Sequence, residues 1–137
     1  MGIQDLDRLG EIANFANAFT GYNFMMDTDT THSSNCILID EYGHVIKSPI
    51  TKLVADNLRK DGYRPFVPDL LDFHRKKIIE YQEEPEPYKG AKITKKGHDE
   101  FSDEDKDLYY QLAGFKQLKI WESDKYWMIK VQLFLTG

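Results

Sequence analysis

Residues 36–39 form a short run, Cys36-Ile37-Leu38-Ile39, in which every side chain is apolar. Neighbouring side chains of a strand point to opposite faces of a sheet, so such a strand needs apolar cover on both faces. A second apolar pair, Val45-Ile46, follows a turn in which Gly43 can take a positive φ. The pattern predicts a β-hairpin whose first strand lies centrally in a sheet, covered on both sides or at a subunit contact.

Two helices are predicted in the first half of the chain. Residues 3–20 carry apolar side chains at helical spacing and end before Gly21. Residues 49–60 begin with Pro49 at a first helical position and end before Gly62.

Two further helices are predicted in the second half, over residues 69–81 and from Ser102 to Gly114. Ser102 is expected to cap the second of them, because acidic residues follow it in the first turn. The side chains expected to face the core are Leu70, Leu71, Phe73 or His74, and Ile78 in the first helix, and Leu108, Tyr109 and Leu112 in the second.

The C-terminal residues alternate between apolar and more polar side chains. The apolar positions are Trp127, Ile129, Val131, Leu133 and Leu135. Alternation with period two predicts a strand with one buried face, and Trp127 is expected on that face. This strand is expected to pair as an antiparallel hairpin with residues 118–120, across a turn at residues 123–125.

The chain has 137 residues, which suits one domain. The predicted fold is therefore a small single α+β domain over residues 1–137. Its sheet is mostly antiparallel and built from two hairpins, with about four helices packed on it. Residues 82–90 contain Pro85 and Pro87 and are expected to form an exposed linker or loop.

Composition excludes several classes of protein. Apolar residues make up 41% of the chain, which is too many for a disordered acidic tail, and no run of about 18 apolar residues could span a bilayer. The first residues, Met1 to Arg8, lack the apolar segment of a secretory signal. Cys36 is the single cysteine, which excludes an internal disulfide and a cysteine-built zinc site. We therefore expect a cytoplasmic protein with no membrane segment and no cofactor.

Charge is segregated along the chain, whose net charge is −5. Residues 1–46 carry seven acidic and one basic residue, whereas residues 47–77 carry eight basic and four acidic residues, a local net charge of +4. The basic stretch is a candidate surface for phosphates or for an acidic protein. The alternative is that its bases lie at helix C-termini, where the helix dipole favours them. The candidate binding residues are Arg59, Lys60, Arg64, Arg75, Lys76 and Lys77.

The segment Asp27-Thr28-Asp29-Thr30-Thr31 follows an apolar step and resembles the first motif of haloacid-dehalogenase-type phosphatases. The resemblance implies that Asp27 is a nucleophile, that Asp29 carries the proton, and that Mg²⁺ binds between carboxylates. It covers five residues, and Glu122 and Asp124 are the later acidic pair that could complete the metal site. In the alternative interpretation, the same Asp and Thr side chains stabilise a loop by bonding to the backbone.

Aromatic residues flank the predicted C-terminal turn. Trp121 and Tyr126 could anchor a protein partner, because Trp and Tyr are enriched in binding hot spots. We therefore expect a non-catalytic protein-interaction module: an adaptor, an inhibitor or an accessory subunit of phage or mobile-element type, with self-association as a further option. An acidic module of this kind could act as a charge mimic on a nucleic-acid-handling protein. The alternatives are a nucleic-acid-associated protein using residues 47–77, and a small Mg²⁺-dependent phosphatase or phosphotransferase using Asp27 and Asp29.

Overall fold

A four-stranded sheet forms the middle layer of the domain. The computed structural model describes residues 3–26, 35–47, 57–82 and 100–137. The strands run in the order β1-β5-β6-β7: β1 (Met25–Met26), β5 (Leu70–Asp72), β6 (Lys77–Gln82) and β7 (Lys116–Trp121). The first three strands pair antiparallel and β6 pairs parallel with β7, so the sheet is mixed.

A second, three-stranded antiparallel sheet has the order β3-β2-β4: β2 (Ile37–Ile39), β3 (Val45–Lys47) and β4 (Arg64–Phe66). All three residues of β2 are buried. This confirms the predicted hairpin and the central position of its first strand. Gly43 has the positive φ, 87°, that its turn requires.

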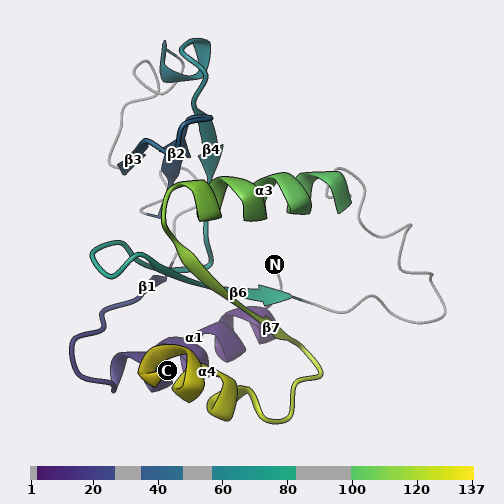
Figure 1. The fold of residues 1–137 in the computed structure, drawn as a ribbon. Helices are drawn as coiled ribbons and strands as arrows, with labels where there is room; N and C mark the ends of the chain where they lie inside the picture. The colour runs from purple at the N-terminus through teal and green to yellow at the C-terminus, as the bar shows by residue number, and fades with distance from the viewer. Residues whose placement is uncertain (1–2, 27–34, 48–56, 83–99) are drawn as a thin grey trace, which may run out of the picture.

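Helices cover both faces of the four-stranded sheet (Figure 1). Helix α1 (Ile3–Asn17) and helix α4 (Trp127–Thr136) lie on one face, and helix α3 (Glu100–Leu112) lies on the other, beside the three-stranded sheet. Residues 57–60 are also helical. The chain is thus a small α+β domain, as predicted.

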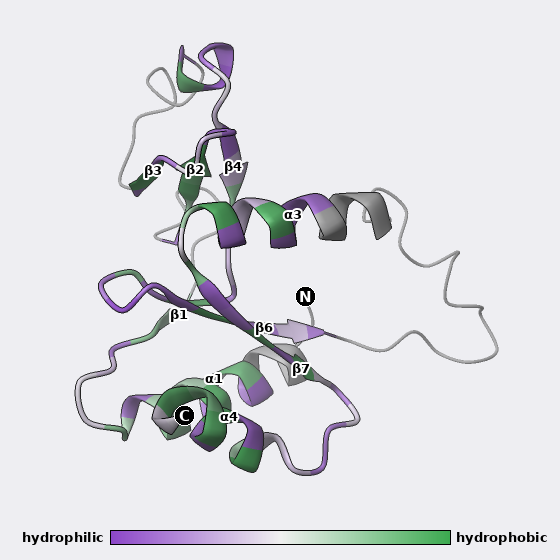
Figure 2. Cartoon of the chain, in the orientation of Figure 1, coloured by the Kyte–Doolittle hydropathy of each residue, from purple (hydrophilic) through white to green (hydrophobic). Residues whose placement is uncertain are grey.

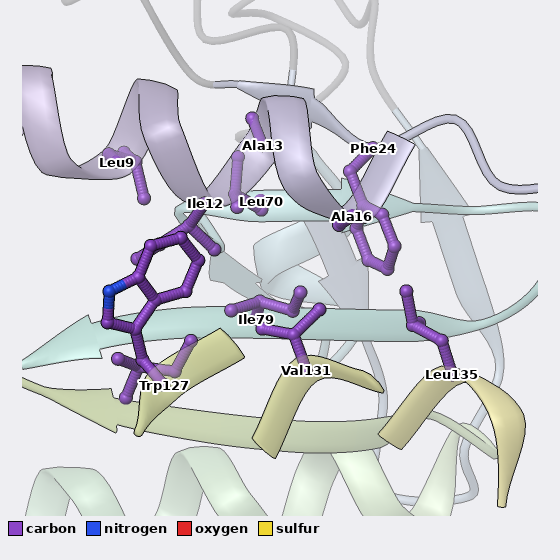
Figure 3. Packing of buried hydrophobic residues seen from close by; sticks show 11 residues of the cluster. Leu9, Ile12, Ala13, Ala16, Phe24, Leu70, Ile79, Trp127, Val131 and Leu135 are labelled. Carbon is purple, nitrogen blue, oxygen red and sulfur yellow. The ribbon is translucent and has the colours of Figure 1, made fainter. Parts of the chain in front are cut away.

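Two apolar cores result from this layering. The first lies between the sheet and the pair α1 and α4, and Figure 3 shows Trp127, Val131 and Leu135 of α4 turned toward Ile79. The second lies between the sheet, α3 and β2, and contains Ile78. The adjacent residues Ile78 and Ile79 of β6 therefore lie in different cores, on opposite faces of the sheet.

The predicted helix over residues 69–81 is wrong, because this segment forms the β5–β6 hairpin. The pair Leu70-Leu71 places one side chain in each core, as does Ile78-Ile79. A helix would gather these residues on one face, whereas a strand covered on both faces buries all four. His74, expected on a helix stripe, is exposed in the hairpin turn.

The predicted C-terminal strand is also wrong, because residues 127–136 form α4. Seven of these ten residues are apolar, so the segment satisfies helical spacing as well as alternation. Trp127, Val131 and Leu135 follow one another at intervals of four residues, and all three are buried, as on one face of a helix. Residues 118–120 do lie in a strand, but β7 pairs parallel with β6 and not with the C-terminal segment.

Helices at 3–17 and 100–112 confirm two predictions, with differences in detail. The backbone of Ser102, the expected cap, lies inside α3. Leu108 and Leu112, expected to face the core, are exposed, and Tyr110 is buried instead. Pro49, where the predicted helix 49–60 begins, lies outside the described residues. So does the expected linker at 82–90, except for Gln82 at the end of β6.

We predict that Trp127→Ala lowers the free energy of unfolding by about 3–5 kcal/mol, the usual effect of truncating a buried aromatic residue. The Trp127 side chain is buried and meets the ring of Phe15 edge to face, with 5.7 Å between ring centroids. Met128→Ala, on the exposed neighbouring residue, is the control and should change stability little. Equal unfolding midpoints in urea for the two variants would contradict the burial of Trp127 against Phe15.

The turn between β2 and β3 packs closely against the end of α3, and substitutions of Gly43 test this contact. A Cβ atom at Gly43 would overlap with the carbonyl oxygen of Leu112, whereas one at Gly62, which also has a positive φ, would meet nothing within 4 Å. We expect Gly62→Ala to cost about 1–2 kcal/mol from backbone strain alone. Gly43→Ala should cost about 2–5 kcal/mol, because steric overlap adds to that strain. Similar melting temperatures for the two variants would mean that the turn does not press against α3.

Candidate interaction surface

The side of α4 that faces away from the sheet is apolar as well. Tyr126 is 71% exposed, Ile129 is 54% exposed and Leu133 is 64% exposed. Their spacing, i, i+3 and i+7, places them in one line along the helix, opposite the buried residues. We call Tyr126, Ile129 and Leu133 the outer stripe. Figure 2 shows that α4 is coloured as hydrophobic over most of its length.

Asp124 fixes the chain at the start of α4. Its carboxylate accepts hydrogen bonds from the Lys130 ammonium at 2.7 Å and from the backbone N–H of Trp121 at 2.8 Å. The hydrogen bond from Lys130 is the main reason why the pKa of Asp124 lies below its ordinary value. Asp124 therefore ties the end of β7 to the second turn of α4 and holds the segment that carries Tyr126.

The outer stripe carries no charge. Lys130 is the one charged residue of α4, and its ammonium is bonded to Asp124. At the other end of the helix, the backbone N–H of Gly137 donates to the carbonyl oxygen of Leu133 at 2.8 Å and closes the last turn. The stripe is therefore a neutral apolar surface on a helix that is fixed at both ends.

The structure exposes both aromatic residues that the sequence singled out. Trp121 is 41% exposed at the end of β7, and Tyr126 belongs to the outer stripe. Sequence analysis missed Ile129 and Leu133 as surface residues, because the predicted strand placed them on its buried face. The signal that could have found them is the four-residue spacing of Trp127, Val131 and Leu135, which leaves Ile129 and Leu133 on the opposite side of a helix.

The basic candidates do not gather in one place. Arg59 and Lys60 are exposed in the segment before β4, at the far end of the three-stranded sheet, whereas Arg75 to Lys77 lie in and beside the β5–β6 turn (Figure 1). Arg64 donates to the Asp105 carboxylate at 3.0 Å, and its guanidinium lies over the ring of Tyr109.

The three bases of the hairpin make contacts within the chain. The Arg75 guanidinium lies 5.6 Å from the centre of the Tyr22 ring. The Lys76 ammonium donates to the carbonyl oxygen of Ala113, just after α3, and the Lys77 ammonium donates to that of Phe134, in the last turn of α4, both at 2.9 Å. The prediction that these bases end a helix of their own is wrong, but both lysines meet the C-terminal ends of other helices, where the dipole favours cations.

The remaining candidates form no catalytic arrangement in the described residues. Asp27, Asp29 and Thr31 lie outside them. Within the described residues, no group of three His, Cys, Asp or Glu side chains is placed to hold a metal ion. Cys36 is partly buried beside β2, and the His44 ring pairs with the Asp40 carboxylate at 2.8 Å.

Comparisons with protein-family models, with curated proteins and with solved structures found no match to this chain. Among the described residues, no helix has the length and apolar character needed to cross a bilayer. Function therefore has to be inferred from the chain's own side chains.

We predict that Lys77→Met destabilises the fold by about 1–2 kcal/mol, because the carbonyl oxygen of Phe134 loses a charged donor at a helix C-terminus. Urea unfolding at two salt concentrations measures the loss. Lys116→Met, which removes an exposed lysine from the neighbouring strand β7, is the control and should change stability by less than about 0.5 kcal/mol. Equal losses in the two variants would show that the contact of Lys77 with α4 contributes nothing.

Proposed function

We propose that this protein is a non-catalytic interaction module, an accessory subunit that binds a partner protein through the outer stripe of α4. The observation that carries the proposal is that α4 is apolar on both sides, while the protein's own core covers one of them. A helix that is hydrophobic all round is normally buried all round. The uncovered side is therefore suited to a second protein surface.

The geometry of the stripe suits recognition of a helix by a groove. Helices that bind in apolar grooves present anchors at i, i+3, i+4 and i+7, and Tyr126, Ile129 and Leu133 occupy three of these positions. Full burial of a Leu or Ile side chain contributes about 1.5–3 kcal/mol. Tyr is also a frequent hot-spot residue, because its ring is rigid and its hydroxyl can find a partner at the rim of an interface.

Charge favours a protein over the other partners considered. Nucleic acids and anionic lipids are held by Lys and Arg side chains. The one cation of α4, Lys130, is already bonded to Asp124, and the chain as a whole carries −5. An acidic charge mimic would bind through its carboxylates, so salt would weaken its complex. Contact through the outer stripe instead predicts a complex that resists salt.

The test uses the full-length chain as bait in extract of its native host, with Leu133→Glu and Leu108→Glu beside the native sequence. Leu133 and Leu108 are both exposed leucines on helices, 64% and 52% exposed, but only Leu133 lies on α4. We expect a protein that co-purifies in a stoichiometric complex with the native chain and with Leu108→Glu. Leu133→Glu should weaken that complex by at least about 30-fold, which corresponds to about 2 kcal/mol.

The captured protein is then purified and titrated with each variant at low and high salt, with nuclease present. Thermal unfolding should give the same midpoint for Leu133→Glu as for the native chain, which excludes misfolding as the cause of any loss. Binding that survives Leu133→Glu, or that disappears with nuclease or salt, would overturn the proposal. A homodimer that Leu133→Glu dissociates, with no second protein, would overturn the accessory-subunit role in favour of self-assembly.

A further inference from the structure

Two carboxyl groups face each other across the β5–β6 hairpin. Leu70 pairs with Ile79, so Asp69 stands opposite Glu80 at the next position of the register. The backbone N–H of Asp69 lies 3.4 Å from Glu80 Oε2, and the backbone N–H of Tyr81 donates to Asp69 Oδ2 at 2.8 Å. Like charges at directly opposite positions of a sheet repel. The pair is therefore unstable when both groups are ionised.

Glu80 lies in the contact between α3 and the sheet. Its neighbours Ile79 and Tyr81 point to the core on the α1 and α4 side, so Glu80 points toward α3. Only 3% of Glu80 is exposed, and its Oε1 accepts a hydrogen bond from the buried hydroxyl of Tyr110 at 3.2 Å. The carboxyl group is thus a buried polar link between β6 and α3.

Lys106 forms a long ion pair with Glu80, which offsets only part of the effect of burial and of Asp69 on its pKa. The Lys106 ammonium of α3 lies 3.8 Å from Oε1, beyond hydrogen-bond distance, and its side chain is partly exposed. Lys119 stands beside Glu80 on β7, but its ammonium is bonded to the Asp107 carboxylate of α3 at 3.0 Å. Burial, with the charge of Asp69, raises the pKa of Glu80 to about 8 despite Lys106. Burial and Glu80 also raise the pKa of the Tyr110 hydroxyl, which therefore remains a donor.

We propose that the Asp69–Glu80 pair is a proton-operated latch: with a proton on Glu80 it holds α3 against the sheet, and loss of that proton releases α3. The protonated carboxyl can bond to Asp69 while it accepts from Tyr110, so every partner is satisfied. The ionised carboxylate would be a second buried negative charge facing Asp69, and this charge can reach water only if α3 moves away.

The direction of the pH effect follows from the two pKa values of Glu80. In the unfolded chain this pKa is near 4.5, and in the folded chain it is about 8. Between these values the folded state keeps a proton that the unfolded state has lost, so stability falls as pH rises through this window. Opening of α3 that exposes Glu80 to water follows the same rule: its free-energy cost falls as pH rises through this window and levels off above pH 8, without global unfolding.

Hydrogen–deuterium exchange of the full chain between pH 6.5 and 9 tests the latch, with rates corrected for intrinsic exchange. We expect the protection of α3 amides in the native chain to fall between pH 6.5 and pH 8, by up to tenfold for each pH unit, and to level off above pH 8, while amides of α1 and α4 keep theirs. Glu80→Gln keeps a neutral acceptor for Tyr110 and should hold α3 closed at every pH. Leu108→Gln, at an exposed position of the same helix, is the control and should keep the native pH dependence.

Two results would overturn the latch. One is equal protection of α3 at pH 6.5 and pH 9 in the native chain. The other is a loss of protection with rising pH that Glu80→Gln does not abolish. If Glu80→Gln does not fold, the carboxyl carbon-13 resonance of Glu80 in the native chain decides: titration near pH 8 supports the latch, and titration near pH 4.5 excludes it.

Discussion

The structure depends on the β5–β6 hairpin being apolar on both faces. Leu70 and Ile79 supply the core beneath α1 and α4, and Leu71 and Ile78 supply the core beneath α3 and β2. A hairpin exposed on one face could not bury both pairs, so the domain needs a layer on each side of the sheet. The short strand β1 and the six-residue strand β7 extend this hairpin into a sheet wide enough to carry the helices.

The turn of the same hairpin also fixes the helices. Lys76 and Lys77 follow each other in the chain and donate to carbonyl oxygens at the C-terminal ends of α3 and α4, which lie on opposite faces of the sheet. Lys76 is the last residue of the turn and has a positive φ of 53°, whereas Lys77 begins β6, and the two adjacent lysines reach opposite faces. A stretch that is basic in the sequence therefore serves the interior contacts of the fold.

The outer stripe and the buried Glu80 are two of the places where the fold departs from the rule that apolar groups are buried and charges exposed. On α4, apolar side chains remain in water because the helix has apolar residues on two opposite sides and the core covers one of them. At Glu80, a carboxyl group is enclosed opposite a second one. Such departures cost stability, and they are where function is expected. The first suggests a partner protein, and the second suggests a response to protons.

The sequence alone determined the elements whose local signals agree: the helices at 3–17 and 100–112, the hairpin of β2 and β3, and the central place of β2. It also singled out Trp121 and Tyr126, which the structure exposes. Only the tertiary structure decided between helix and strand for residues 69–81 and 127–136. Leu70-Leu71 and Ile78-Ile79 satisfy either period, as do the apolar residues of α4, so local pattern cannot choose between them. The choice depends on which faces of a segment are covered by apolar residues from distant parts of the chain. The same long-range packing turns Ile129 and Leu133 outward and brings Glu80 against Tyr110.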